Sequence, residues 1–201
     1  MSPVLESDGV TSGYVAVIRD VTEEHWRTEK LMDAALKDPL TGLYNRRGLE
    51  LRAEAVQHRS DADQRLPAWI MVDIDHFKVV NDTYGHDSGD TVIRAVAAML
   101  LSAARDDDIV ARLGGEEFVL LLPHAPLHAA AAVAERLRGT VEAAVVDSAG
   151  CAIKVTASFG VAQQALGEGQ AAVLERADAA LYEAKRGGRN RVALSNARAG
   201  T

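Results

Sequence analysis

Two short apolar segments separated by a glycine pair constrain the fold of this chain most. Residues 109–113 and 118–122 are each long enough for one β-strand, and residues 114–117 (Gly-Gly-Glu-Glu) connect them. A tight turn between antiparallel strands needs residues that adopt positive φ, and glycine does so without steric cost. The pattern therefore predicts a β-hairpin whose turn presents two carboxylates. An ordinary solvated hairpin with acidic residues would show the same pattern.

A second acidic segment follows an apolar run further upstream. Residues 69–72 (Trp-Ile-Met-Val) show no polar alternation, which is typical of a strand buried on both faces. The strand ends in Asp73-Ile74-Asp75, and because side chains alternate along a strand, the two acids share one face. A divalent cation between Asp73 and Glu116 would relieve the repulsion of their carboxylates. The alternative is an edge strand that runs out into solvent.

Helical and strand patterns alternate from residue 38 onward. We predict helices over about residues 47–59, 91–104, 126–143 and 170–185, and strands over 68–74 and 154–161 in addition to the hairpin. Residues 77–90 carry more turn-forming and polar residues than a simple exit loop needs. Two helix-and-strand units around an antiparallel hairpin match a ferredoxin-like arrangement. The predicted fold class is therefore α+β, with a central antiparallel sheet surrounded by helices.

The first 37 residues have a different organisation. After a polar start, residues 13–20 form the one clear strand pattern of this region. A helix is predicted over residues 22–37, with Thr22 as its N-cap and Pro39 just beyond its end. Its apolar positions make a poor coiled-coil seam, so the pattern leaves open whether this linker helix is solvated or pairs with a second copy.

Composition excludes some functional classes. The net charge of −7 argues against a nucleic-acid-binding protein, because a basic surface supplies most of that affinity. No apolar stretch approaches the length of about 18 residues that a membrane helix needs, so we expect no membrane span in this chain. Cys151 is the single cysteine, and we expect it to be a small core residue in a reducing compartment.

Motifs in a fixed order carry a resemblance to one protein family. They occupy residues 38–47, 73–82, 84–90, 114–118, 158–161 and 177–190. Over about residues 38–194 the chain resembles the GGDEF-domain diguanylate cyclases. The resemblance implies a palm-like sheet and a cytoplasmic bacterial enzyme that condenses two GTP into cyclic di-GMP and releases two pyrophosphates. It also divides the chain into the last strand of a PAS-like sensor (1–21), a signalling linker helix (22–37) and the cyclase domain (38–197), with most of the upstream sensor missing.

The resemblance also assigns roles to individual residues. Asp73, Glu116 and the backbone carbonyl of Ile74 match the ligands of Mg²⁺ or Mn²⁺. Glu117 is expected beside them, supporting the metal or the attacking hydroxyl, so Asp73, Glu116 and Glu117 form the implied catalytic set. The implied substrate-binding residues are Phe77, Lys78, Asn81, Asp90, Gly114, Gly115, Lys185 and Arg189.

Base choice is expected to depend on Asn81 and Asp90. A carboxylate accepts from guanine N1–H and N2–H₂, and an amide NH₂ donates to O6, so this pair complements guanine. Asn81 could instead cap a helix, and Asp90 could be a solvated acid at the start of the helix beginning at Thr91. Lys185 likewise has a second interpretation, because a basic side chain at a helix end interacts favourably with the helix dipole.

Arg105 and Asp108 have the R-x-x-D spacing of the product-binding inhibitory site in this family. Arg105 stands nine positions before Gly114, which is the usual offset. Arg136 matches a secondary arginine of that site, although an arginine on a helix surface would look the same. A charged run at a helix exit is also typical of a solvated loop.

The expected partners are GTP as substrate, cyclic di-GMP as product and inhibitor, and a second copy of the chain, because each domain would hold one GTP of the two that react. No nucleic acid is expected as a partner. Two other functions stay open. One is a domain that only binds cyclic di-GMP, although the metal acids Asp73 and Glu116 would then have no use. The other is an interaction domain whose helix 22–37 merely dimerises a sensor.

Overall fold

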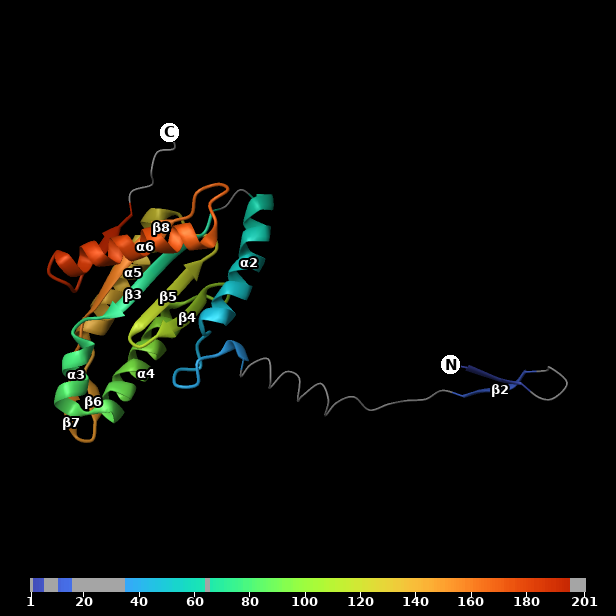
Figure 1. Ribbon diagram of the computed structural model, residues 1–201, viewed down its shortest axis with the longest axis horizontal. Coiled ribbons are helices and arrows are strands. Elements are labelled where there is room, and N and C mark those ends of the chain that lie inside the picture. Colours follow the sequence, from blue (N-terminus) through green and yellow to red (C-terminus); the bar gives the residue numbers. More distant parts are fainter. Residues whose placement is uncertain (1, 6–10, 16–34, 64–65, 196–201) are drawn as a thin grey trace. The chain divides into compact units, whose positions relative to one another are not determined.

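The central sheet has five strands, and its order differs from the order of the chain (Figure 1). The computed structural model of the protein describes residues 2–5, 11–15, 35–63 and 66–195. In sheet order the strands are β4 (Ile109–Gly114), β5 (Glu117–Leu122), β3 (Ala68–Ile74), β8 (Ala157–Gln163) and β9 (Val192–Leu194). The first four pair antiparallel, as predicted, whereas β9 runs parallel to β8. The sheet is therefore mixed, because a helix connects β8 to β9 and returns the chain in the same direction.

Helices cover both faces of this sheet. Helices α3 (Phe77–Tyr84), α4 (His86–Ala103) and α5 (Leu127–Ala143) pack on one face. Helices α2 (Arg46–Asp63) and α6 (Gln170–Arg186) pack on the other, and α6 crosses the strands obliquely in Figure 1. The predicted α+β class is confirmed.

The burial of strand β3 explains why residues 69–72 show no alternation of polar and apolar side chains. Each of its residues is buried. Ile70 and Val72 belong to the core beneath α3, α4 and α5, whereas Trp69 and Met71 belong to the core beneath α2 and α6. A central strand with a hydrophobic layer on each face has no solvent side on which polar residues would be favoured. The predicted strand bounds of 68–74 match those observed.

Residues 77–90 contain more helix than their composition suggested. His76 has a φ of 56° and reverses the chain after β3, and Phe77 and Val80 then anchor α3 in the core. Gly85, with a φ of 84°, separates α3 from α4, which begins at His86 rather than near Thr91. Polar residues dominate this segment because only one side of α3 and of the first turns of α4 contacts the core.

Two expectations drawn from composition can be compared with the structure. Cys151 is exposed, so its expected place in the core is wrong. It begins β7 (Cys151–Ile153), which pairs with β6 (Val146–Ser148) in a ribbon that reaches the core only through Val146 and Ile153. The strand predicted over 154–161 accordingly starts later, at Ala157. Among the helices of the described residues, none combines the length and the apolar character needed to cross a membrane.

The chain before residue 35 forms a separate unit. Its described part is a pair of antiparallel strands, β1 (Ser2–Leu5) and β2 (Thr11–Val15), with Pro3 opposite Tyr14. Residues 13–15 of the predicted strand over 13–20 lie in β2, whereas β1 was not predicted and supplies the hydrogen-bonding partner that β2 needs. Residues 16–20 and most of the predicted helix 22–37 lie outside the described residues, and the assignment of 1–21 to a PAS-like sensor stays a prediction.

An ion pair at the start of α6 links the helix to the loop before it. Arg176 donates from Nε to Glu168 Oε1 (2.8 Å) and from Nη2 to Glu168 Oε2 (2.6 Å). Hydrogen bonds from Arg176 hold the pKa of the Glu168 carboxyl below its usual range, although burial opposes this effect. Because the folded-state pKa is the lower one, the pair stabilises the fold above the unfolded-state pKa and this contribution is lost as pH falls through the folded-state pKa.

Replacing Glu168 with glutamine should therefore lower the free energy of unfolding at neutral pH by about 2 kcal/mol, since Arg176 loses its charged acceptor. The difference should shrink at an acidic pH below the folded-state pKa of Glu168, where the carboxyl of the wild type is also protonated. Urea unfolding at both pH values measures it. As a control, Glu183→Gln removes the exposed pair with Arg186 and should change stability by less than about 0.5 kcal/mol. An equal loss for Glu168→Gln at both pH values would contradict a charge-dependent contribution.

Candidate active site

The end of β3 lies next to the acidic hairpin turn. Asp73 is opposite Glu117 in the register of β3 and β5, and the Ile74 N–H donates to the Glu116 carbonyl (3.4 Å). The structure thus brings together Asp73, Ile74 and the two glutamates, which the sequence places in separate segments. Asp73 is buried, with 6% of its surface exposed. The glutamates are half-buried at the turn.

Several charges converge on the Asp73 carboxylate. Burial raises the pKa of Asp73 above its ordinary value, and the negative charges of Glu116 and Glu117 add to this increase. The Lys185 ammonium, whose Nζ lies 2.8 Å from Asp73 Oδ2, opposes it. Lys185 comes from the last turn of α6, so a positive side chain from a helix on one face of the sheet meets the carboxylate at the end of β3. Such a concentration of negative charge favours the binding of a cation.

The side-chain donors do not form a complete metal cage. Within the part of the chain that the structure describes, no group of three or more His, Cys, Asp or Glu residues is placed to hold a metal ion. Mg²⁺ commonly binds to one or two carboxylates and completes its shell with water and substrate phosphate oxygens. Asp73, Glu116 and the Ile74 carbonyl fit that kind of site, in which the substrate supplies part of the coordination.

The hairpin turn is held in place by Arg112. Gly114 and Gly115 have φ values of 146° and 53°, so both glycines are needed for backbone conformation. Arg112 donates from Nε (3.0 Å) and Nη2 (2.8 Å) to the Gly115 carbonyl, and from Nη1 to both carboxylate oxygens of Asp38. Burial disfavours the Asp38 charge, but hydrogen bonds from Thr41 and Arg112 hold the pKa of Asp38 below its usual value. The turn is thereby tied to the segment that precedes α2.

The two residues predicted to recognise the base lie on neighbouring helices. Asn81 is inside α3, so the alternative of an Asn81 helix cap is wrong, and Asp90 is inside α4, which begins at His86 rather than at Thr91. A Cβ on Gly89 would clash with Asn81 Oδ1 and would lie 3.2 Å from the Phe77 ring. The absence of a side chain at Gly89 therefore allows α4 to approach the Asn81 amide closely. Asp90 is partly exposed, and its Oδ2 lies 3.9 Å from Arg94 Nη2.

The remaining predicted phosphate contacts lie at the surface. Lys78 is exposed on α3, and Arg189 is exposed in the loop that follows α6. Arg189 and Asn190 adopt φ values of 63° and 46°, which are uncommon for residues other than glycine. The loop therefore has a defined turn conformation after the end of α6, the helix that carries Lys185.

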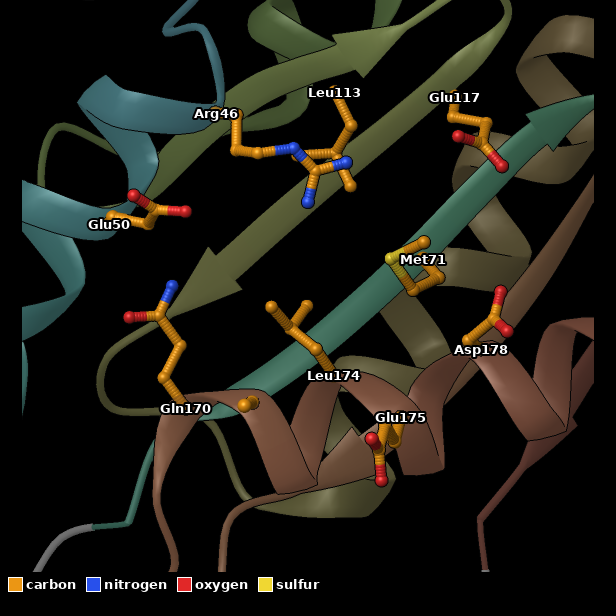
Figure 2. A pocket seen from close by; sticks show the side chains of 10 residues that line it. Arg46, Glu50, Met71, Leu113, Glu117, Gln170, Leu174, Glu175 and Asp178 are labelled. Carbon is orange, nitrogen blue, oxygen red and sulfur yellow. The ribbon is translucent and has the colours of Figure 1, made fainter.

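A cavity of about 610 Å³ lies beside the hairpin, between α2 and α6. Figure 2 shows its apolar floor, formed by Met71, Leu113 and Leu174, and Glu117 at its edge. Neither Asn81 nor Asp90 lines it, because their helices cover the opposite face of the sheet. Its size alone does not identify it as the nucleotide site.

A second cavity, of about 350 Å³, is lined by Arg105, Asp108 and Arg136. The Arg105 N–H donates to Asp108 Oδ2 (2.9 Å), and Arg136 Nη2 donates to the Ala103 carbonyl (3.3 Å). Arg136 comes from α5, whereas the other two lie between α4 and β4. The structure therefore brings all three residues of the predicted product site to one pocket.

Comparison with known proteins identifies the family. Residues 35–191 match the sequence profile described as "Diguanylate cyclase, GGDEF domain". The chain belongs to the GGDEF family. The match includes the acidic hairpin, the end of β3 and the loop after α6.

Three relatives of this GGDEF domain are named as diguanylate cyclases. DgcP of Pseudomonas aeruginosa is 42% identical over 180 residues, which cover 88% of this chain and 26% of the relative. DgcM of Escherichia coli K12 is 43% identical over 178 residues, which cover 89% of this chain and 43% of the relative. VdcA of Vibrio cholerae is 45% identical over 166 residues, which cover 81% of this chain and 48% of the relative. The chain thus spans between a quarter and a half of the length of these curated relatives.

Solved GGDEF structures are similar in fold. The coiled coil and GGDEF domain of DgcB from Caulobacter crescentus, in complex with c-di-GMP, matches with a TM-score of 0.82 at 34% identity, covering 87% of this chain and 93% of that one. The active GGEEF domain of a diguanylate cyclase from Vibrio cholerae matches with a TM-score of 0.69 at 33% identity. The match covers 76% of this chain and 97% of that one.

Sequence reasoning did not single out two side chains that shape the site of this GGDEF domain. Arg112 positions the turn, and its only sequence signal was a charge within an otherwise apolar strand pattern. Asp75 was recognised as an acid at the end of β3, but its partners come from residues far along the chain. Both act through contacts that no local pattern reports.

Proposed function

We propose that this chain is a diguanylate cyclase that uses Mg²⁺ or Mn²⁺ to condense two GTP into cyclic di-GMP with release of two pyrophosphates. The observation that carries this proposal is the meeting of Asp73 with Glu116 and Glu117 beside Lys185, in a GGDEF domain. Acids and a basic group concentrated at the end of β3 and the neighbouring hairpin turn suit a polyphosphate substrate with a divalent cation. Named relatives with this activity support the same conclusion.

The reaction requires attack by the 3′-hydroxyl of one GTP on the α-phosphorus of the other. Asp73, Glu116 and the Ile74 carbonyl would hold the metal, which when bound supplies positive charge against the phosphate oxygens. Lys185, Lys78 and Arg189 add positive charge around the polyphosphate. Pyrophosphate leaves as the new phosphodiester bond forms, and the attacking hydroxyl loses its proton.

Other groups position the substrate. Gly114 and Gly115 have no side chains, so phosphate can approach the backbone of the turn. Glu117 lies where it can orient the metal ligands or accept the proton of the attacking hydroxyl. Asn81 and Asp90 would bind guanine through O6 and through N1–H and N2–H₂, with the Phe77 ring beside the Asn81 amide.

Two further properties belong to this proposal. One domain holds a single GTP, so two copies must face each other with their half-sites in contact, which a two-fold symmetric dimer achieves. Cyclic di-GMP would bind at Arg105, Asp108 and Arg136 and act as an inhibitor. Arginine stacks on guanine and donates two parallel hydrogen bonds to phosphate, which suits this ligand. The DgcB structures contain c-di-GMP, which supports a product site in the family.

The decisive experiment incubates the purified chain with GTP and Mg²⁺ and separates the nucleotides by chromatography. We expect cyclic di-GMP and pyrophosphate, and no product when EDTA is present. Because two half-sites must meet, the rate per chain should rise with protein concentration until dimers saturate. Binding of cyclic di-GMP without any turnover at high protein concentration would instead indicate a binding domain. A rate per chain that stays constant while sedimentation shows only monomers would contradict the paired-site mechanism.

A further inference from the structure

The second acid at the end of β3 has no role in the reaction described above. Asp75 is buried, with 4% of its surface exposed. Its Oδ1 accepts from the Ser158 hydroxyl (2.7 Å), and its Oδ2 accepts from the Thr156 hydroxyl (2.7 Å) and from the Asn190 N–H (3.0 Å). Three neutral donors therefore satisfy this carboxylate, whereas Asp73 faces acids and an ammonium group.

The contact with Asn190 fixes the loop that follows α6. Arg189 and Asn190 both adopt left-handed backbone conformations. Such conformations are unfavourable for residues with a Cβ and persist only where surrounding contacts enforce them. Here the Asn190 N–H donates to Asp75, which lies 115 positions earlier in the sequence.

The Asn190 side chain holds the same loop from a second direction. Its Nδ2 donates to Glu142 Oε1 (2.7 Å), and its Oδ1 accepts from Arg138 Nη1 (2.9 Å). Both partners belong to α5. Asn190 is thus hydrogen-bonded to the end of β3 through its backbone and to α5 through its side chain. These bonds hold the backbone next to Arg189 in one position.

We propose that Asp75 and Asn190 are positioning residues that hold the loop after α6 so that Arg189 reaches the substrate phosphates. This role rests on the proposed function, because it presumes that Arg189 contacts GTP. The two acids of the strand end, which look equivalent in sequence, then have different tasks. Asp73 takes part in cation and phosphate chemistry, and Asp75 acts only through hydrogen bonds.

Conservative substitution separates these tasks. In Asp75→Asn, the amide oxygen can accept from Thr156 and the Asn190 N–H, while the amide NH₂ donates to the Ser158 hydroxyl, which also has acceptor capacity. Asp75→Asn should therefore keep most of its activity and the same Mg²⁺ requirement, whereas Asp73→Asn should lose activity. Asp75→Ala should raise KM for GTP about tenfold or more, because the loop loses its anchor. If Asp75→Asn is as inactive as Asp73→Asn, the positioning role is wrong.

A double-mutant cycle tests whether Asn190 affects nucleotide binding through Arg189. This test does not require that the Asp75→Ala variant folds. Asn190→Gly removes the side-chain hydrogen bonds but permits the same backbone conformation. Binding of 3′-deoxy-GTP, which cannot cyclise, is measured by calorimetry for the wild type, Asn190→Gly, Arg189→Ala and the double variant. We expect each single change to weaken binding about fivefold or more, and the double variant to be little weaker than Arg189→Ala alone.

The outcomes of this cycle are distinct. Additive losses would mean that Asn190 does not act through Arg189 and would overturn the proposal. Unchanged binding in Asn190→Gly, with normal nucleotide binding by the wild type, would also overturn it while leaving the proposed function intact. A wild type that neither binds nor cyclises guanine nucleotides would refute the proposed function, and this inference with it.

Discussion

Replacing Glu116 with glutamine should reduce cyclic di-GMP synthesis by at least ~10³-fold, because the change removes a carboxylate that neutralises and places the metal against the transferring phosphate. Asp73→Asn should have an effect of the same order. Glutamine has nearly the shape of glutamate, so the hairpin turn should persist. Initial rates at saturating GTP and Mg²⁺ measure the loss, and thermal unfolding shows whether each variant remains folded.

The matched control for this prediction is Glu175→Gln. Glu175 is an exposed acid of α6 that lines the neighbouring cavity of Figure 2 but lies outside the group around Asp73. Its replacement removes the same charge and should leave the rate unchanged. Activity of Glu116→Gln within about tenfold of the wild type would place the metal elsewhere, since a missing metal ligand costs far more.

Replacing Arg105 with alanine should weaken the binding of cyclic di-GMP by roughly 1.5 to 3 kcal/mol, which is the contribution of hydrogen bonds that involve a charged group. This corresponds to a loss of about tenfold or more in affinity. Inhibition by added product should need correspondingly more ligand. Because the Arg105 cavity is separate from the hairpin turn, the uninhibited initial rate should stay the same, or rise once co-purified product is no longer retained.

Calorimetric titration and inhibition curves of the wild type and Arg105→Ala test this prediction together. Arg105→Lys is an informative second variant, because it keeps the charge but cannot donate two parallel hydrogen bonds, and it should recover only part of the affinity. Equal inhibition of the wild type and Arg105→Ala, or no product binding by the wild type, would reduce residues 105–108 to an acidic surface loop. The proposed cyclase activity would be unaffected by that result.

The parts of the fold that the sequence predicted are those with local signals. Strand β3 was predicted with its observed bounds because burial on both faces leaves an uninterrupted apolar run. The hairpin was predicted because a glycine pair between two apolar segments leaves few alternatives. By contrast, α3, the β6–β7 ribbon and β9 were missed, since short elements owe their stability to tertiary contacts rather than to their own pattern.

The candidate site divides in the same way. Residue types and spacing were sufficient to name Asp73, Glu116, Arg105 and Asp108 as a group of interest through the family they resemble. The resemblance singled out Asp73 but gave Asp75 no role, because the partners of Asp75 at residues 156, 158 and 190 are distant in the sequence.

The sequence by itself thus determined the fold class, the family and the chemical groups available to the reaction. Only the tertiary structure decided that Asp73 meets Lys185, that Asp75 holds Asn190, and that Arg136 joins Arg105 in one cavity. The physical reason is that a side chain's charge state and role depend on which distant groups its strand or helix brings within hydrogen-bonding range. Those partners are selected by the packing of the whole domain, which no short stretch of sequence specifies.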